Sequence, residues 1–289
     1  MRTSCLSNSN AFSSERLRQE AVAVFTDLDG TLLDHHGYSY AGAVTALERL
    51  RQQAIPLILV SSKTRIEIEA LLGRLRLAYP FIMENGGGLF FPPAFDAMRL
   101  PDAEAVGSGR LVRLGRPYAE IRRFFATVRE RFHLRGFGDM DREEIAARTG
   151  LPLIEAERAR QREFSEPFLF LGKEQPDELA ALAAANGLAL TRGGRFYHLL
   201  SAGQDKGRAI RAVVGIFAAN GCPIGRTIGL GDSANDQPLL AAVDIPVLIP
   251  HPDGHFEPLE FPGLRRAPAP GSLGWGTIIH RLLDEMERS

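Results

Sequence analysis

The sequence predicts an α/β protein whose doubly wound, mostly parallel sheet is interrupted by an inserted α+β domain. Three observations lead to this fold class. Short apolar runs alternate with segments of helical periodicity, as they do around parallel sheets. One segment, residues 55–62 (IPLILVSS), carries a continuous apolar run, which is typical of a strand buried on both faces. The alternation stops near residue 91 and resumes near residue 205, so one domain interrupts another.

The residues before position 91 supply the first half of the predicted sheet. Residues 21–25 predict the first strand, and residues 43–53 predict a helix with apolar side chains on one face. A second helix is predicted at residues 64–75, after the strand at 55–62. Residues 81–91 (FIMENGGGLFF) predict two strands that a tight, glycine-rich turn joins.

The middle of the chain has a different composition and a different pattern of apolar residues. Residues 91–110 are rich in Pro and Gly, and they predict a linker or an irregular loop. Beyond them the sequence predicts helices at residues 118–132, 142–150 and 177–187 and strands at residues 168–171, 188–192 and 195–200. Because this region has strands and helices of its own, we interpret it as an inserted domain.

The doubly wound pattern returns in the last third of the chain, with a predicted helix at residues 205–221 and strands at 227–232 and 245–249. We therefore predict a flexible tail of residues 1–19, a core domain of residues 20–92 and 199–289, and an inserted domain of residues 93–198. Ligands of open α/β sheets bind at the carboxyl ends of the strands. The predicted site lies there.

Composition narrows the functional class. The 289 residues are 45% hydrophobic and 24% charged, with a formal net charge of −1, so no global field indicates a nucleic-acid or membrane partner. The polar first 20 residues lack the apolar core of a signal peptide, and no segment reaches the about 18 apolar residues of a membrane helix. Two cysteines are too few for a disulfide framework. We expect a cytoplasmic protein.

Two acidic clusters follow predicted strands. Asp27 and Asp29 come after the first strand in DLDGT, and Asp232 and Asp236 come after a later one in GLGDSAND. Carboxylates that meet at one sheet edge repel one another, and a hard divalent cation such as Mg²⁺ offsets that repulsion. No His or Cys accompanies them, which argues against Zn²⁺. Self-capping turns are the structural alternative for either cluster alone.

Other segments supply hydroxyl and cationic groups. Ser61 or Ser62, at a strand end, can donate a hydrogen bond to a phosphoryl oxygen, although either can instead cap the next helix. Lys206 opens a predicted helix, where a cation opposes the helix dipole, so a phosphate partner explains it better. Asp27 is placed to attack phosphorus, and Asp29 is placed to protonate the leaving group and then deprotonate water.

These four segments, DLDGTLLD, ILVSSKT, QDKGRAI and GLGDSANDQPLL, resemble the ordered motifs of the haloacid dehalogenase-like (HAD) phosphohydrolase superfamily over about residues 21–250. The resemblance implies a Rossmann-like core and an α/β cap of the Cof-like branch. It makes Asp27 the nucleophile, Asp29 the acid/base, Ser61 or Ser62 the phosphate ligand and Lys206 the charge-balancing lysine. Asp27, the Asp29 carbonyl and Asp232 would hold Mg²⁺, supported by Asn235 and Asp236.

Finer features, SSKTR, ENGGGLFF and REFSEPF among them, resemble the mannosyl-3-phosphoglycerate phosphatase family. The implied substrate is a small phosphorylated sugar-glycerate, 2-O-mannosyl-3-phosphoglycerate, which yields mannosylglycerate and phosphate. We then expect its carboxylate to be bound by the guanidinium groups of Arg162, Arg192 and Arg195. We expect its hydroxyl groups to be bound by Glu84, Asn85, Glu166 and His198. Alternatives are a glucosyl-3-phosphoglycerate phosphatase, a sucrose- or trehalose-phosphate phosphatase, a phosphomannomutase and a non-catalytic phospho-ligand sensor.

Overall fold

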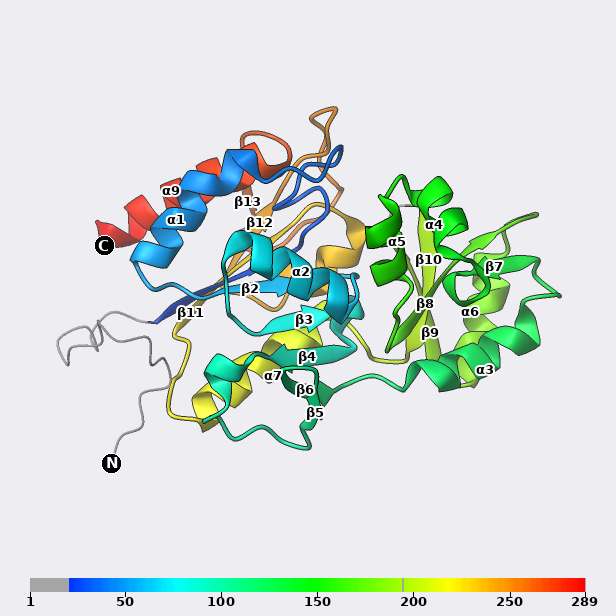
Figure 1. The fold of residues 1–289 in the computed structure, drawn as a ribbon. Coiled ribbons are helices and arrows are strands. Elements are labelled where there is room, and N and C mark those ends of the chain that lie inside the picture. Colours follow the sequence, from blue (N-terminus) through cyan, green and yellow to red (C-terminus); the bar gives the residue numbers. More distant parts are fainter. Residues whose placement is uncertain (1–20, 194, 289) are drawn as a thin grey trace.

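The computed structural model of the chain describes residues 21–193 and 195–288, so the tail predicted for residues 1–19 lies outside the described part. Within that part, nine strands form one sheet in the order β13-β12-β11-β1-β2-β3-β4-β6-β5 (Figure 1). Their bounds are β1 Val22–Thr26, β2 Leu57–Val60, β3 Phe81–Met83, β4 Gly88–Phe91, β5 Glu104–Val106, β6 Gly109–Arg113, β11 Arg226–Gly231, β12 Ile245–Leu248 and β13 Arg265–Arg266.

The sheet is parallel from β13 to β3, and β4, β6 and β5 extend it in antiparallel fashion. Strand β1 lies in the middle, between β11 and β2. Its residues Ala23, Val24 and Phe25 have no exposed surface, because helices cover both faces of the sheet. The predicted fold class, a doubly wound and mostly parallel α/β core, is confirmed.

The helices form two layers around this sheet. Helices α1 (Val44–Gln52), α2 (Arg65–Leu75) and α9 (Gly271–Glu287) cover one face, while α7 (Lys206–Ala219) and α8 (Gln237–Leu240) cover the other (Figure 1). Trp275 of α9 is fully buried, and its indole N–H donates to the Thr26 hydroxyl at 3.0 Å. Helix α9 was not predicted, although its buried face ties the end of the chain to β1.

The inserted domain, which we call the cap, is built on a four-stranded antiparallel sheet in the order β7-β8-β10-β9. Helices α3 (Tyr118–Val128) and α6 (Pro176–Ala185) pack on one face of it. Helices α4 (Arg142–Thr149) and α5 (Leu153–Ala159) form a second small core that Phe196 joins. The strand bounds are β7 Leu134–Gly136, β8 Ser165–Phe170, β9 Leu188–Gly193 and β10 Phe196–Ser201.

The cap boundaries differ from the predicted ones. Strands β5 and β6 belong to the large sheet, with Phe90 of β4 opposite Leu111 of β6. Residues 91–110 are therefore part of the core rather than a linker, and their Pro and Gly residues mark the turns between its strands. The cap sheet also continues to Ser201, beyond the predicted boundary at residue 198. By strand pairing, the insertion runs from about residue 114 to residue 201.

Other elements of the cap also differ, and β7 was not predicted. Strand β8 begins at Ser165, three residues before the predicted start, and it includes Pro167 opposite His198. Proline is normally absent from central strands, so Pro167 made the sequence predict a later start for this strand. Helix α5 follows Pro152 and was not predicted.

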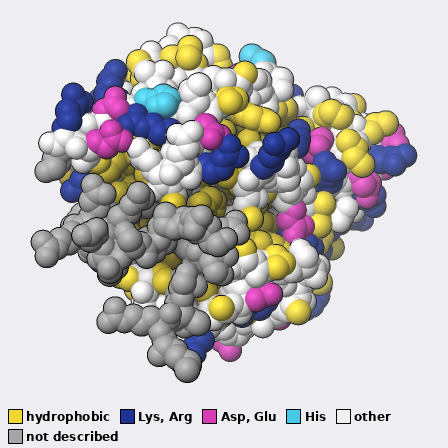
Figure 2. Space-filling view, turned by 60° about the vertical axis from the view of Figure 1, so that its left-hand side comes forward, with side chains coloured by type: hydrophobic (Ala, Val, Ile, Leu, Met, Phe, Trp, Pro, Cys, Tyr) yellow, Lys and Arg dark blue, Asp and Glu magenta, His cyan; other side chains and the backbone are white. Residues whose placement is uncertain are grey.

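The helices and the charge distribution on the surface bear on membrane and nucleic-acid partners. In the described part of the chain, no helix is long and apolar enough to cross a membrane. On the face that Figure 2 shows, basic and acidic side chains are interspersed with apolar ones rather than gathered by sign.

Candidate active site

The candidate site lies where three neighbouring parallel strands end. Asp27 follows β1, Ser61 follows β2 and Asp232 follows β11. The Asp27 backbone N–H donates to the Leu230 carbonyl at 2.9 Å, which continues the β1–β11 ladder to the end of the strands. The sheet register therefore brings together segments that lie about 200 positions apart in the sequence.

Three buried carboxylates and one ammonium meet at this edge. One ligand oxygen from each of Asp27, Asp232 and Asp236 lies within 4.8 Å of the others. The Lys206 Nζ, only 1% exposed, lies 2.7 Å from Asp27 Oδ1 and 2.6 Å from Asp236 Oδ1. The Thr31 hydroxyl donates to Asp232 Oδ1 at 3.2 Å. One positive charge thus faces three acidic groups.

The excess of negative charge in this cluster shifts the pKa values of its side chains. Burial, followed by the charge of Asp236, raises the pKa of Asp27 to about 7, against the opposing effect of Lys206. Burial and the charges of Asp236 and Asp27 raise the pKa of Asp232 to about 9. Burial works against the Lys206 ammonium, but Asp236 and Asp27 raise its pKa above the ordinary value. The cluster is short of positive charge, and a bound cation would supply it.

The hydrogen bonds show which oxygens such a cation could use. Asp236 Oδ1 accepts from Lys206, and Asp236 Oδ2 accepts from the Asp232 and Ser233 backbone N–H groups at 3.1 and 3.2 Å and from the Ser233 hydroxyl at 3.1 Å. Asp236 is therefore occupied in holding the loop. Among the described residues, no hydrogen bond is made to Oδ2 of Asp27 or of Asp232. These two oxygens fit a hard divalent cation.

Gly30 leaves room for this arrangement. Its φ of +83° lies in the left-handed region, and a Cβ there would stand 2.4 Å from Asp232 Oδ2. Both the turn and the close approach of the acidic side chain therefore require glycine. Because Gly30 has no side chain, the backbone of the DLDGT motif can lie directly against the Asp232 carboxylate.

Asp29 points away from the carboxylate cluster. Its Oδ2 lies 2.8 Å from Lys63 Nζ, and its buried Oδ1 has no hydrogen-bond partner in the described part of the chain. The Lys63 ammonium also lies 5.1 Å from the centre of the Tyr38 ring. Lys63 was not among the predicted site residues. Its signal was available, because the chain has only three lysines and this one stands in the SSKT segment.

The two candidate serines differ in their surroundings. Ser61 is 1% exposed, and its hydroxyl accepts from the Lys63 backbone N–H at 3.2 Å, which leaves its own O–H as a donor. Ser62 is half-buried, and its carbonyl accepts from the Arg162 guanidinium at 2.9 Å. Both follow the carboxyl end of β2, at the same edge of the sheet as Asp27, which follows β1.

Comparison with known proteins decides the family. Residues 24–90 match the model of the haloacid dehalogenase-like hydrolase family. A glucosyl-3-phosphoglycerate/mannosyl-3-phosphoglycerate phosphatase from Persephonella marina is 44% identical over 267 residues, which are 92% of this chain and 99% of that protein. The chain belongs to the HAD hydrolase superfamily and is a phosphatase. A protein of the same name from Methanococcoides burtonii is 39% identical over 90% of this chain and 96% of its own length.

Solved structures agree with the fold of this HAD phosphatase. A HAD-superfamily phosphatase from Bacteroides thetaiotaomicron has a TM-score of 0.64 at 17% identity, over 96% of this chain and 99% of that one. A protein from Thermoplasma acidophilum also has a TM-score of 0.64, at 18% identity, over 93% and 99% of the two chains. At these identities the likeness concerns the fold alone.

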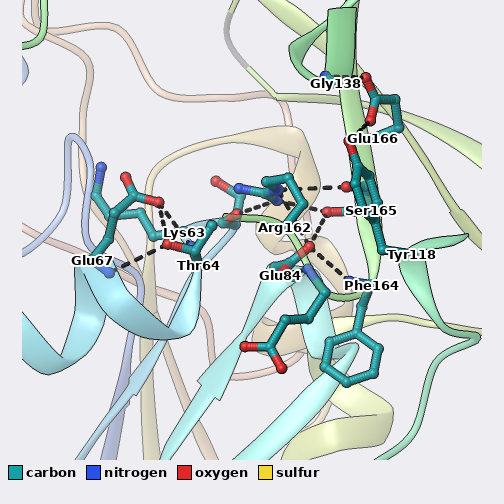
Figure 3. Close-up of polar contacts among 12 residues, drawn as sticks. Lys63, Thr64, Glu67, Glu84, Tyr118, Gly138, Arg162, Phe164, Ser165 and Glu166 are labelled. Atoms are coloured by element: carbon teal, nitrogen blue, oxygen red, sulfur yellow. Dashed lines mark hydrogen bonds and ion pairs between the residues drawn. The ribbon is translucent and has the colours of Figure 1, made fainter. Parts of the chain in front are cut away.

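Glu84 and Arg162, both predicted to bind substrate, pair with each other between the core and the cap of this phosphatase (Figure 3). Glu84 has no exposed surface, and its carboxylate lies 3.3 Å from Arg162 Nε. It also accepts from the Glu163 and Phe164 backbone N–H groups at 2.7 and 3.1 Å and from the Ser165 hydroxyl at 2.7 Å. These bonds use the carboxylate as a clamp between core and cap, and the role of the pair in substrate binding stays a prediction.

Glu166 and Arg192 share one face of the cap sheet. Glu166 stands opposite Leu199 and Arg192 opposite Tyr197, so both side chains lie on the face that α3 covers. Glu166 accepts from the Gly138 N–H at 2.9 Å and also bonds the Tyr118 hydroxyl (Figure 3). These contacts lie within the cap, and the role of Glu166 and Arg192 in substrate binding stays a prediction. Among the described residues, Arg162, Arg192 and Arg195 each contact different groups: Arg162 pairs with Glu84, Arg192 with Tyr197 and Arg195 with Thr149.

The remaining predicted residues lie where the cap meets the site. A Cβ on Gly193 of β9 would stand 3.4 Å from both Asn235 Nδ2 and His198 Nε2, so both side chains lie against the same side of Gly193. Burial, with the charges of Arg162 and Lys206, lowers the pKa of His198 to about 3 and keeps its imidazole neutral. Arg195 is exposed at the end of the β9–β10 hairpin and donates to the Thr149 carbonyl at 2.8 Å.

Two polar side chains near this junction lack partners. Both side-chain polar atoms of Asn85 and Nδ1 of His198 are buried without a hydrogen bond among the described residues. Asn85 is held in place by its backbone N–H, which donates to the Ser61 carbonyl at 2.9 Å. Buried polar atoms normally have partners, so these atoms are available to a bound ligand.

Proposed function

We propose that this phosphatase hydrolyses 2-O-mannosyl-3-phosphoglycerate and its glucosyl analogue, releasing the sugar glycerate and phosphate. The observation that carries the chemistry is the buried pair of Asp27 and Lys206 at the end of β1, with Asp232 beside it. The names of the two relatives, which include both sugars, support the substrate.

The reaction follows from the placement of two aspartates. A carboxylate oxygen of Asp27 attacks phosphorus, and the bond between phosphorus and the glycerate C3 oxygen breaks as Asp29 gives that oxygen a proton. Asp29 then takes a proton from water, whose oxygen attacks the aspartyl-phosphate. Phosphate leaves, and the Asp27 carboxylate is restored.

A metal completes the proposed site. Asp27, Asp232 and the backbone carbonyl of Asp29 would hold Mg²⁺, which neutralises charge on the phosphoryl oxygens when bound. Lys206 keeps Asp27 oriented at 2.7 Å, and Asp236 fixes the loop that carries Asp232. Asn235 accepts from the Ser233 hydroxyl at 2.7 Å, and we propose that it supports the same loop.

The remaining groups are proposed to bind the rest of the substrate. Ser61 or Ser62 donates to a phosphoryl oxygen at the end of β2. Asn85 and His198 bind sugar or glycerate hydroxyls, since their buried polar atoms are otherwise unpaired. The core, through Asn85, and the cap, through His198, would thus both contribute to specificity. The proposed compartment is the cytoplasm, because a substrate with a phosphate and a carboxylate does not cross membranes unaided.

The test is phosphate release from a panel of compounds. It contains mannosyl- and glucosyl-3-phosphoglycerate, sucrose and trehalose phosphates, and simple hexose phosphates. We expect the two phosphoglycerates to have the highest kcat/KM, and EDTA to abolish turnover until Mg²⁺ is restored. Faster turnover of a hexose phosphate would overturn the substrate assignment, and full activity in EDTA would overturn the metal assignment. Binding without turnover of any compound would favour a phospho-ligand sensor.

A further inference from the structure

Lys63 is a charged group at the active-site edge that the proposed reaction does not use. Its side chain is 15% exposed, and its Nζ lies 2.8 Å from Asp29 Oδ2. Burial opposes the ammonium charge, but the charges of Asp29 and Glu67 raise the pKa of Lys63 above its ordinary value. An ammonium has three donors, so Lys63 can hold Asp29 and still bind another acceptor.

The other buried cations nearby already have fixed partners. Lys206 lies between Asp27 and Asp236, and Arg162 is paired with Glu84. The proposed substrate carries two anionic groups, a phosphate and a carboxylate. The cluster around Asp27 accounts for the phosphate, so the carboxylate needs a further cation.

The geometry places Lys63 where that carboxylate must lie. A leaving-group oxygen that Asp29 protonates stands within about 3 Å of its carboxylate. That oxygen is on glycerate C3, and the substrate carboxylate is C1, only two carbon–carbon bonds further along. Lys63 Nζ lies at hydrogen-bond distance from the same Asp29 side chain. The two groups are therefore within reach of each other.

The ring of Tyr38 lies beside the same ammonium, with Lys63 Nζ 5.1 Å from the ring centre. The aromatic ring and the Asp29 carboxylate together hold the Lys63 side chain at this edge of the site.

We propose that Lys63 binds the carboxylate of the substrate's glycerate, and that it makes this phosphatase select phosphoglycerates over glycerol phosphates, which lack the carboxylate. This inference rests on the proposed function. In it, Lys63 bridges Asp29 and the carboxylate, so the acid/base and the leaving group are held by one ammonium.

The experiment compares two substrates that differ only at C1. One is glucosyl-3-phosphoglycerate, and the other is 2-O-glucosylglycerol 3-phosphate, in which a hydroxymethyl group replaces the carboxylate. Loss of a charge-assisted bond lowers kcat/KM about 10- to 100-fold. We expect Lys63→Met to lower the ratio of kcat/KM for the phosphoglycerate to kcat/KM for the reduced analogue by this factor, because any effect through Asp29 is common to both substrates and only the phosphoglycerate also loses the carboxylate bond. Lys63→Arg should keep most of the preference.

The matched control is Lys173→Met, which removes the same charge from an exposed lysine between β8 and α6. It should leave both substrates unchanged. If Lys63→Met is unfolded by circular dichroism, Lys63→Gln takes its place. An equal loss on both substrates would overturn the inference, since Lys63 would then serve Asp29 or the phosphate. No loss on either would also overturn it. If the unmodified enzyme turns over neither compound, the proposed function itself fails, and the inference with it.

Discussion

Replacing Arg162 by Met tests whether the Glu84–Arg162 pair is a clamp or a substrate subsite. The side chains of Arg162 and Glu84 are 3% and 0% exposed. Removing one partner of a buried ion pair costs about 3–5 kcal/mol. Three neutral hydrogen-bond donors still contact the Glu84 carboxylate in this variant. We therefore expect the free energy of unfolding to fall by about 3 kcal/mol, near the lower end of that range. For a chain of this size the melting temperature should fall by about 6–12 °C.

The assay is thermal unfolding of single and double variants. Arg192→Met is the matched control, because it makes the same change at an exposed arginine of the cap, and it should shift stability by less than about 0.5 kcal/mol. Glu84→Leu combined with Arg162→Met removes both charges from the interior. This double variant should lose less stability than the sum of the single variants, because neither charge is left unpaired.

A different pattern would refute the clamp. If Arg162→Met melts within about 2 °C of the unmodified protein and instead raises KM strongly, Arg162 binds substrate in solution. Additive losses in the double variant would show that the two side chains do not act as a pair.

Three further outcomes are expected. Asp27→Asn should keep the melting temperature within a few degrees while turnover falls more than about a thousandfold, and a substantial residual rate of phosphate release would contradict its role as nucleophile. Gly30→Ala should lower kcat at least tenfold, because the new Cβ would stand 2.4 Å from Asp232 Oδ2, and it should cost about 1–2 kcal/mol from the positive φ; unchanged kinetics would count against the turn argument. His198, with a pKa of about 3 when folded and about 6.5 when unfolded, binds more protons in the unfolded chain, so stability falls as pH drops through 6.5. At pH 5 this protonation of His198 in the unfolded chain lowers the free energy of unfolding by about 2 kcal/mol. In His198→Asn, the free energy of unfolding measured with denaturant should therefore change less between pH 6.5 and pH 5.

The core of the site was predictable because few physical constraints decide it. A buried apolar strand followed at once by Asp27 places that carboxylate at a sheet edge, and the same holds for Asp232. Parallel pairing then brings the two ends together. Lys206 was identified by its position at a helix start, which is unfavourable for a cation without an anionic partner. These arguments need no knowledge of the cap.

The cap residues were not predictable in the same way. In a strand, neighbouring residues face opposite sides, so the choice between Glu166 and Ser165 depends on a register that Pro167 obscures. Glu84 resembles a substrate ligand in sequence because it is polar and stands in a turn, yet its partners come from positions 162–165. Contacts between domains leave no periodic signal in either segment.

The position of β1 in the sheet has a consequence for synthesis on the ribosome. Its partner on one side, β2, emerges about 30 residues after it, but its partner on the other side, β11, begins only at Arg226. The nascent chain therefore carries a half-built sheet with an open edge while the whole cap is being translated. Such an edge invites pairing with other chains, so folding in the cell is most vulnerable in that interval.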